Sequence, residues 1–279
     1  MRGGGLFGDH LLSQDGSLLF VSNVDAVVAY ATSTGEQVAR LQHAARVTAV
    51  SLHPCDSLLL FSGSSDGRIT LWDLSTGAPV RLWHVGSPIE SLAVSQAGDT
   101  AYISSHWRLR QAGRLFAYDL GSSVAKTASG RAKVSQARRL VASASGQVLA
   151  TIDRHTALVW TADKFPKAPL ALTHTKPLTC AALSAKGDAL AVGDATGRIL
   201  LWRGVHAALL ARASGQEVDD MDQPAAEQLR ARATVHWHAE PVCCMAFSPD
   251  DAYLLSGGHE GVLVIWDLHM LAAHFALFS

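Results

Sequence analysis

Four histidines recur at one equivalent place in a repeating sequence, where they could do chemistry. His43, His84, His174 and His238 each stand just ahead of an apolar run of strand-forming residues. An imidazole in such a place could ligate a metal or act as a general base. With one such histidine per repeat, however, the rings would lie far beyond the ~2 Å of a shared metal–nitrogen bond. We therefore interpret them as buried hydrogen-bonding groups and predict no metal site.

Other reactive residue types form no catalytic pattern either. The four cysteines, Cys55, Cys180, Cys243 and Cys244, have no C-x-x-C spacing and are interpreted as reduced, small apolar side chains. The chain has no G-x-S-x-G elbow and no H-E-x-x-H helix, and its N-terminal glycine run lacks the Lys-Ser/Thr ending of a phosphate loop. The sequence therefore predicts a non-enzymatic protein with no catalytic residue and no cofactor.

Composition limits the class of protein further. Apolar residues make up 48% of the 279 residues, charged residues 17%, and the net charge is -1. This balance excludes wholesale disorder and argues against non-specific nucleic-acid binding over the whole surface. No window reaches the ~18 uncharged apolar residues of a membrane helix, and no secretory signal is visible. We expect an intracellular protein that binds no membrane.

A phrase that recurs three times indicates the elements that carry these residues. A Gly-containing turn leads into an apolar strand that closes on Trp, twice followed by Asp, at residues 62–74, 193–202 and 256–268. This is the ending of a WD repeat, the four-stranded unit of a β-propeller. The sequence therefore predicts an all-β, WD40-type β-propeller.

The aromatic residue that closes each repeat allows the blades to be counted. The series is Tyr30, Trp72, Tyr118, Trp160, Trp202 and Trp266, with gaps of 42, 46, 42, 42 and 64 residues. A WD unit spans ~40–45 residues, so only the last gap is too long. We assign its excess to an acidic loop insertion at about 211–233, which holds Glu217, Asp219, Asp220, Asp222 and Glu227. The prediction is one domain over residues 1–279 with six recognisable blades.

Buried polar groups are expected to join the strands within each blade. In WD repeats the histidine links to a turn Asp, a strand Ser or Thr and the closing Trp. The second blade has the whole set, whereas Thr196 and Glu260 replace the turn Asp in later blades. The predicted network residues are His43, Ser62, Asp66, Trp72, His174, Trp202, His238 and Trp266.

The innermost strand of each blade should be covered on both faces. Residues 47–52 and 242–247 are continuous apolar runs of this kind. Trp83 and Trp237 each precede one of the histidines, and we expect both indoles to pack between blades.

The last two repeats carry a more particular pattern. It comprises His236-Trp237-His238, the run Leu254-Leu255-Ser256-Gly257-Gly258 and Val262-Leu263-Val264. These segments resemble the WD-repeat-containing protein 75 family, whose yeast counterpart is Nan1. The preceding repeat, through residues 197–203, is similar to the same family.

The resemblance implies a scaffold subunit in ribosome biogenesis. Family members belong to the UTP-A subcomplex of the small-subunit processome, which binds the 5′ external transcribed spacer of pre-ribosomal RNA in the nucleolus. They act in pre-18S rRNA processing and support transcription by RNA polymerase I. The implied partners are the other UTP-A subunits and this spacer RNA, with no small-molecule substrate.

The same resemblance bears on the extent of the propeller. Family members have two tandem propellers, the first of seven blades, so this chain would cover most of the first. The family pattern is lost from Asp267 onward, which predicts a truncated or altered terminus.

One segment is strongly basic and could contact RNA phosphates. Its residues are Arg108, Arg110, Arg114, Lys126, Arg131, Lys133, Arg138 and Arg139. Such side chains release counterions when they bind RNA. Solvated loop charge explains the same pattern, since no aromatic residues for base stacking lie between them, and a dock for an acidic segment is a third interpretation.

Two rival functions predict features that can be looked for. A general WD-repeat adaptor, such as a ubiquitin-ligase substrate receptor, often carries Asp-x-Arg after the closing dipeptide, where this chain has Leu74-Ser75 and Leu268-His269. A propeller hydrolase would need polar ligands that converge on the central channel.

Overall fold

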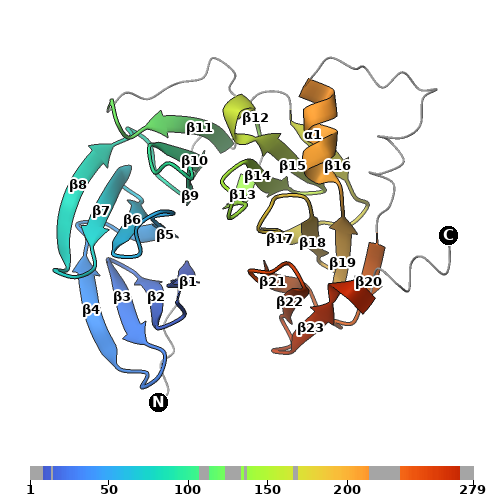
Figure 1. The fold of residues 1–279 in the computed structure, drawn as a ribbon, viewed down its shortest axis with the longest axis horizontal. Helices are drawn as coiled ribbons and strands as arrows, with labels where there is room; N and C mark the ends of the chain where they lie inside the picture. Colours follow the sequence, from blue (N-terminus) through green and yellow to red (C-terminus); the bar gives the residue numbers. More distant parts are fainter. Residues whose placement is uncertain are drawn as a thin grey trace. The chain divides into compact units, whose positions relative to one another are not determined.

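The computed structural model describes residues 9–13, 15–106, 113–122, 133–134, 137–165, 169–213 and 233–270. The chain divides into two compact units, residues 1–140 and 141–279. Strands form nearly all of the regular structure in both units (Figure 1). Within the described ranges, no helix is long and apolar enough to cross a membrane.

The first unit is built from three antiparallel sheets, each of four strands. Their strand orders are β1-β2-β3-β4, β5-β6-β7-β8 and β12-β11-β10-β9. The bounds are β1 His10–Leu12, β2 Leu18–Asn23, β3 Ala26–Ala31, β4 Gln37–Gln42, β5 Val47–Leu52, β6 Leu59–Ser64, β7 Arg68–Asp73, β8 Ala78–His84, β9 Ser91–Val94, β10 Thr100–His106, β11 Gly113–Asp119 and β12 Lys133–Val134.

The second unit has the same meander, and its first strand crosses the boundary between the units. The sheet orders are β13-β14-β15-β16, β17-β18-β19-β20 and a three-stranded β21-β22-β23. The bounds are β13 Ala137–Ala142, β14 Val148–Asp153, β15 Thr156–Thr161, the 3₁₀ turn Ala162–Lys164, β16 Leu170–Thr173, β17 Leu178–Leu183, β18 Leu190–Asp194, β19 Arg198–Trp202, α1 Val205–Ala213, β20 Ala233–His236, β21 Val242–Phe247, β22 Tyr253–Gly258 and β23 Leu263–Asp267.

The hairpin turns explain why glycine recurs before the closing strand. Gly67, between β6 and β7, has a φ of +82°, a conformation that L side chains rarely adopt. A Cβ on Gly67 would also lie 2.7 Å from the carbonyl oxygen of Ser87. The backbone therefore requires glycine here both for the turn and for the close approach of the next loop.

Sheets that are neighbours within one unit bury the faces that they turn toward each other. In the first unit β2 lies against β5, and β5 against β9 (Figure 1). Phe61, Ile69 and Ile103 are fully buried in one of the clusters between these sheets. In the second unit β14 lies against β17, and β17 against β21. A lone sheet could not bury both of its faces, so this stacking provides the core.

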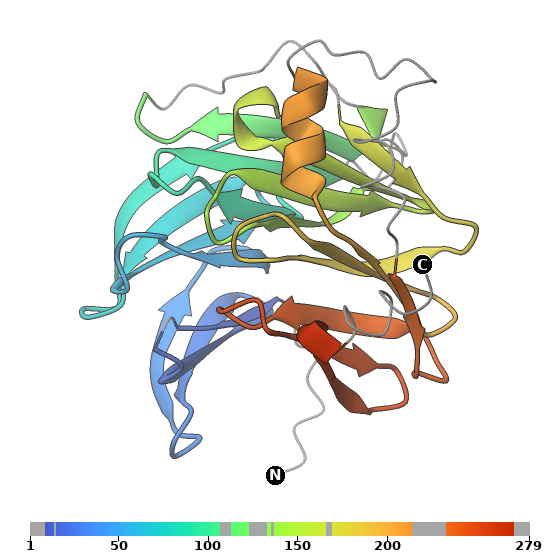
Figure 2. The same cartoon turned by 45° about the vertical axis from the view of Figure 1, so that its right-hand side comes forward.

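A helix that the sequence analysis does not predict lies just ahead of the predicted insertion and overlaps only its first three residues. The chain leaves β19 and forms α1, which stands beside the sheet of β13–β16 (Figure 2). Val205, Ala208 and Leu209 of α1 pack with Trp202 in the core of the second unit. The alanine-rich run 206–213 is the sequence signal for this helix. The acidic residues of the insertion lie outside the described ranges.

The sequence predicts that the innermost strands are covered on both faces and that Trp83 and Trp237 pack between sheets. Each prediction is confirmed at one position and wrong at the other. Strand β5 is covered on both faces, but in β21 the side chains of Cys244 and Ala246 are exposed. Trp83 is buried and its indole N–H donates to the carbonyl of Leu120 at 2.9 Å, as expected of an indole between sheets. Trp237 is instead 70% exposed.

Candidate interaction surfaces and the buried polar networks

The last sheet contains a complete buried hydrogen-bond chain. The indole N–H of Trp266 donates to Ser256 Oγ at 2.8 Å, and Ser256 Oγ lies 2.7 Å from Nε2 of His238. The other ring nitrogen of His238, Nδ1, lies 2.5 Å from a carboxylate oxygen of Glu260. Because that carboxylate only accepts, Nδ1 carries a proton, and in the neutral ring Nε2 then accepts from Ser256. The hydrogen bond from His238 holds the pKa of Glu260 below its usual value.

The sheet of β17–β20 forms a related contact with a different carboxylate. His174 Nε2 lies 3.0 Å from Oδ2 of the fully buried Asp194. Burial acts to raise the pKa of Asp194, but hydrogen bonds from Arg198, Thr196 and His174 outweigh it and hold the pKa below its usual value. The sequence pattern indicates only that Thr196 replaces the turn Asp, whereas the histidine's partner is Asp194, two residues earlier.

The β6–β7 and β18–β19 hairpin turns place an acid and an alcohol in opposite order along the chain. In the β6–β7 turn, Ser64 Oγ donates to Asp66 at 2.5 Å. In the β18–β19 turn, Thr196 Oγ1 donates to Asp194 at 2.8 Å. Asp194 follows Gly193 as Ser64 follows Gly63, so the acid and the alcohol have changed places. Each carboxylate also accepts from a backbone N–H further along the chain. Asp66 accepts from Arg68, two residues on, and Asp194 accepts from Arg198, four residues on.

The sheet β5–β8 forms only part of the hydrogen-bond network that its sequence predicts. The indole of Trp72 donates to Ser62 Oγ at 2.7 Å. The ring of His43 packs edge-on against Trp72 with centroids 5.0 Å apart. Within the described residues, however, His43 Nε2 is buried without a hydrogen-bond partner, and burial lowers the pKa of this histidine. Asp66 is engaged by Ser64 and Arg68 instead.

The basic segment is described only in part. Arg114 is exposed on β11, and the register of the β11–β12 pair places Lys133 directly opposite it. Arg138 lies in β13, and the half-exposed Arg139 forms an ion pair with Asp9. The other predicted members lie outside the described residues, namely Arg108, Arg110, Lys126 and Arg131.

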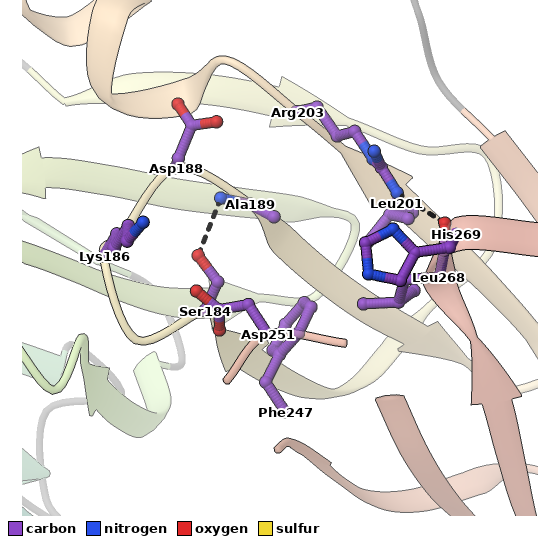
Figure 3. A pocket seen from close by; sticks show the side chains of 10 residues that line it. All are labelled: Ser184, Lys186, Asp188, Ala189, Leu201, Arg203, Phe247, Asp251, Leu268 and His269. Atoms are coloured by element: carbon purple, nitrogen blue, oxygen red, sulfur yellow. Dashed lines mark hydrogen bonds between the residues drawn. The ribbon is translucent and has the colours of Figure 1, made fainter. Parts of the chain in front are cut away.

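A small pocket opens in the second unit at one end of the sheets that contain β18 and β22 (Figure 3). Its volume is about 190 Å³, and Leu201, Phe247 and Leu268 form its apolar part. The charged residues around it are two cations and two acids, with a histidine: Lys186, Arg203, Asp188, Asp251 and His269.

Two of those charged side chains brace the pocket wall. Arg203 donates to the carbonyl of Leu268 at 3.0 Å, and Asp251 accepts from the N–H of Ala185 at 2.7 Å. Within the described residues, no group of three His, Cys, Asp or Glu side chains could hold a metal ion. We interpret the pocket as a junction between neighbouring sheets.

Comparison with known proteins adds the family context. The model "WD repeat-containing protein 75 first beta-propeller" matches residues 11–209, and the model "WD domain, G-beta repeat" matches residues 230–267. WD repeat-containing protein 75 of Danio rerio is 26% identical over 274 residues, which cover 92% of this chain and 31% of that protein. The Homo sapiens protein of the same name is 28% identical over 272 residues, which cover 92% of this chain and 30% of that protein.

A shorter match involves a protein named for a nucleolar RNA. U3 small nucleolar RNA-associated protein 17 of Schizosaccharomyces pombe is 50% identical over 34 residues, 12% of this chain and 4% of that protein. Together with the antiparallel four-stranded sheets, the two family models confirm the predicted WD40-type β-propeller class. That the sheets belong to a ring of seven stays a prediction.

Proposed function

Because the chain belongs to the family of the first β-propeller of WD repeat-containing protein 75, we propose that it is a non-enzymatic scaffold subunit in ribosome biogenesis. The match of this family model over residues 11–209 is the observation that carries the proposal. The relatives also confirm the resemblance inferred from the last repeats. The chain spans about 30% of the length of these relatives, so the activity of a whole protein is part of the proposal.

The proposed setting is the small-subunit processome in the nucleolus. There the chain would hold other UTP-A subunits during pre-18S rRNA processing and would support RNA polymerase I transcription. The name of the fission-yeast relative, a protein associated with U3 small nucleolar RNA, supports this setting. The buried histidines support a scaffold too, because they are used within sheets and are not presented to a substrate.

Affinity purification of the protein from cells tests the proposal. We expect the other UTP-A subunits to co-purify together with 5′ external transcribed spacer RNA. Recovery of a cullin ubiquitin ligase in their place would support the adaptor alternative and would overturn the proposal.

RNA contact by the basic segment is the finer part of the proposal. Arg114 and Arg138 are chosen for mutation, and Arg139 is left unchanged because it forms an ion pair with Asp9. Changing Arg114 and Arg138 together to Glu should weaken crosslinking to spacer RNA several-fold, since phosphate contacts are lost and repulsion is added. The control Arg212→Glu reverses an exposed charge on α1. Equal crosslinking of both variants would mean that the segment is only solvated charge.

A further inference from the structure

Trp237 is the most exposed large apolar side chain among the described residues. It lies in the loop between β20 and β21, and 70% of its surface is in contact with water. An indole on a surface loop leaves a large apolar area hydrated, which contributes nothing to folding. Exposed tryptophans that a partner covers are among the residues that contribute most to binding at protein interfaces.

The exposure of Trp237 follows from its position in the repeat. Trp237 directly precedes one of the repeating histidines, as Gln42 and Thr173 do in earlier sheets. Gln42 and Thr173 are exposed too, although the sheet that follows each of them is packed against its neighbour. The position therefore faces solvent in all three places, and of the three residues only Trp237 is a large aromatic.

Contacts on both sides of Trp237 hold its backbone in place. Before it, Nε2 of His236 donates to the carbonyl of Thr196 across 3.1 Å. After it, both ring nitrogens of His238 are hydrogen-bonded, and a Cβ on Gly197 would lie 1.9 Å from the carbonyl oxygen of His238. A side chain whose backbone is fixed before binding loses less conformational entropy when a partner covers it.

The same loop carries an exposed carboxylate. Glu240 lies three residues after Trp237, and its carboxylate is 3.7 Å from Nδ1 of the exposed His259. So long a contact between two exposed side chains is weak, which leaves Glu240 available to a stronger cation. The basic Arg198 stands opposite His236 in the β19–β20 register, beside the strand that precedes the loop. The loop 237–241 itself has no Lys or Arg, so its formal charge is negative.

An indole face and a carboxylate on one rigid loop are suited to a cationic side chain. The face of Trp attracts Lys and Arg more strongly than the face of Tyr or Phe does, and a nearby carboxylate adds to the attraction. We propose that Trp237 and Glu240 form a docking site for a Lys or Arg side chain in a basic segment of a partner protein.

Two other occupants fit the loop less well. An aliphatic side chain would need an apolar groove, but Trp237 is the only large apolar side chain exposed in the loop 237–241. An RNA base could stack on the indole, but the phosphates on either side of it would be repelled by Glu240. Charge therefore favours a basic protein segment over both.

The docking site rests on the proposed scaffold role, because its partner is a protein of the same assembly. The two proposals can still fail separately in one purification. Recovery of the UTP-A subunits that does not depend on Trp237 would overturn the docking site alone. Recovery of a different assembly that does depend on Trp237 would overturn ribosome biogenesis alone, and recovery of no partner protein would overturn both.

Variants of Trp237 in the native protein isolated from cells test the aromatic part of the site. Trp237→Ala should lower the recovery of at least one partner protein about tenfold, as expected of a central interface tryptophan. Trp237→Leu keeps apolar area without a ring face and should lose nearly as much, whereas Trp237→Phe should lose less. The matched control Leu210→Ala removes an exposed apolar side chain from α1 and should leave recovery unchanged. The thermal unfolding midpoint should be the same for all four variants and the wild type, since both side chains lie largely in water.

Charge reversal tests the acidic part. Glu240→Lys should lower the recovery of the same partner several-fold, because it replaces attraction of the partner's cation by repulsion. The control Glu36→Lys reverses an exposed acid ahead of β4 and should have no effect.

Photo-crosslinking identifies the occupant directly. With benzoylphenylalanine in place of Trp237, irradiation of the native assembly should capture a peptide of a partner protein, and that peptide should contain Lys or Arg. Nuclease treatment before irradiation should not reduce the capture.

Other results of these experiments would overturn the proposal. Capture of RNA would assign the indole to base stacking, and capture of a peptide of this same chain would mean that the chain covers its own tryptophan. Capture of a partner peptide without Lys or Arg, or of nothing, would remove the basic segment. Full recovery of the partner by Trp237→Leu would show that apolar area is what binds, and unchanged recovery by Glu240→Lys would show that the carboxylate has no part.

Discussion

The sheets β17–β20 and β21–β23 have nearly the same sequence pattern and different surroundings. Gly193 and Gly257 occupy equivalent places, as do Cys180 and Cys244, and Ile199 and Leu263. Ile199 is fully buried and Leu263 is 65% exposed. The difference teaches that the sheet lying on such a face, and not the residues of the face itself, decides how much those side chains contribute to stability.

The largest expected effect tests whether the buried Ile199 contributes more to stability than the exposed Leu263. Ile199→Ala should lower the free energy of unfolding by about 3 kcal/mol, since it leaves a cavity in a filled core. Leu263→Ala in the same chain should change it by less than about 0.5 kcal/mol, because that side chain is largely in water. Urea unfolding of the two variants measures both values. Equal losses would show that the face of β21–β23 is covered after all.

A smaller effect separates the complete polar network from the partial one. Ser256→Ala removes a hydroxyl that serves both Trp266 and His238, and should cost about 2 kcal/mol because the buried His238 and the half-buried Trp266 both lose a partner. Ser62→Ala removes the acceptor of the Trp72 indole and a long bond of 3.4 Å to the carbonyl of Thr70, and about 1 kcal/mol is expected. Thermal and urea unfolding give the two losses. If the Ser62 variant lost more, the contact of His238 with Ser256 would contribute little to folding.

The smallest effect concerns pH. The pKa of Glu260 is lowered from 4.5 by its hydrogen bond with His238, so its contribution to stability is present above that value and is lost as the pH falls through the folded-state pKa. The wild-type chain should therefore lose stability on acidification below about pH 4.5, and Glu260→Gln should lose less over the same range. Unfolding midpoints at about pH 6 and about pH 3.5 measure the difference. If both proteins lost the same amount of stability between the two pH values, the contact between Glu260 and His238 would contribute nothing to folding.

Much of the fold could be read from the sequence because its signals are local. The Gly-containing turns and the closing tryptophans place strands such as β7, β19 and β23 within a residue or two. Trp83 and Trp237 both adjoin a repeating histidine, but only Trp83 is buried, so this local cue was right once and wrong once. These elements depend on neighbours along the chain.

The rest depends on partners that a linear pattern does not specify. Residues 178–183 and 242–247 look alike as apolar runs, yet only the first is covered on both faces. Asp194 could not be predicted because its equivalent in the second sheet is Ser64. Alignment of the two turns therefore pointed to Thr196, the equivalent of Asp66. The ion pair of Arg139 joins residues far apart in sequence, and no local motif indicates that Asp9 is its partner.

The reversed order of acid and alcohol in the β6–β7 and β18–β19 turns has an evolutionary consequence. What the hairpin requires is one of each group within a three-residue span, and either arrangement binds the same downstream amide. Lineages could drift from one order to the other through coupled substitutions, so a search template that demands aspartate at a fixed site would overlook sound repeats.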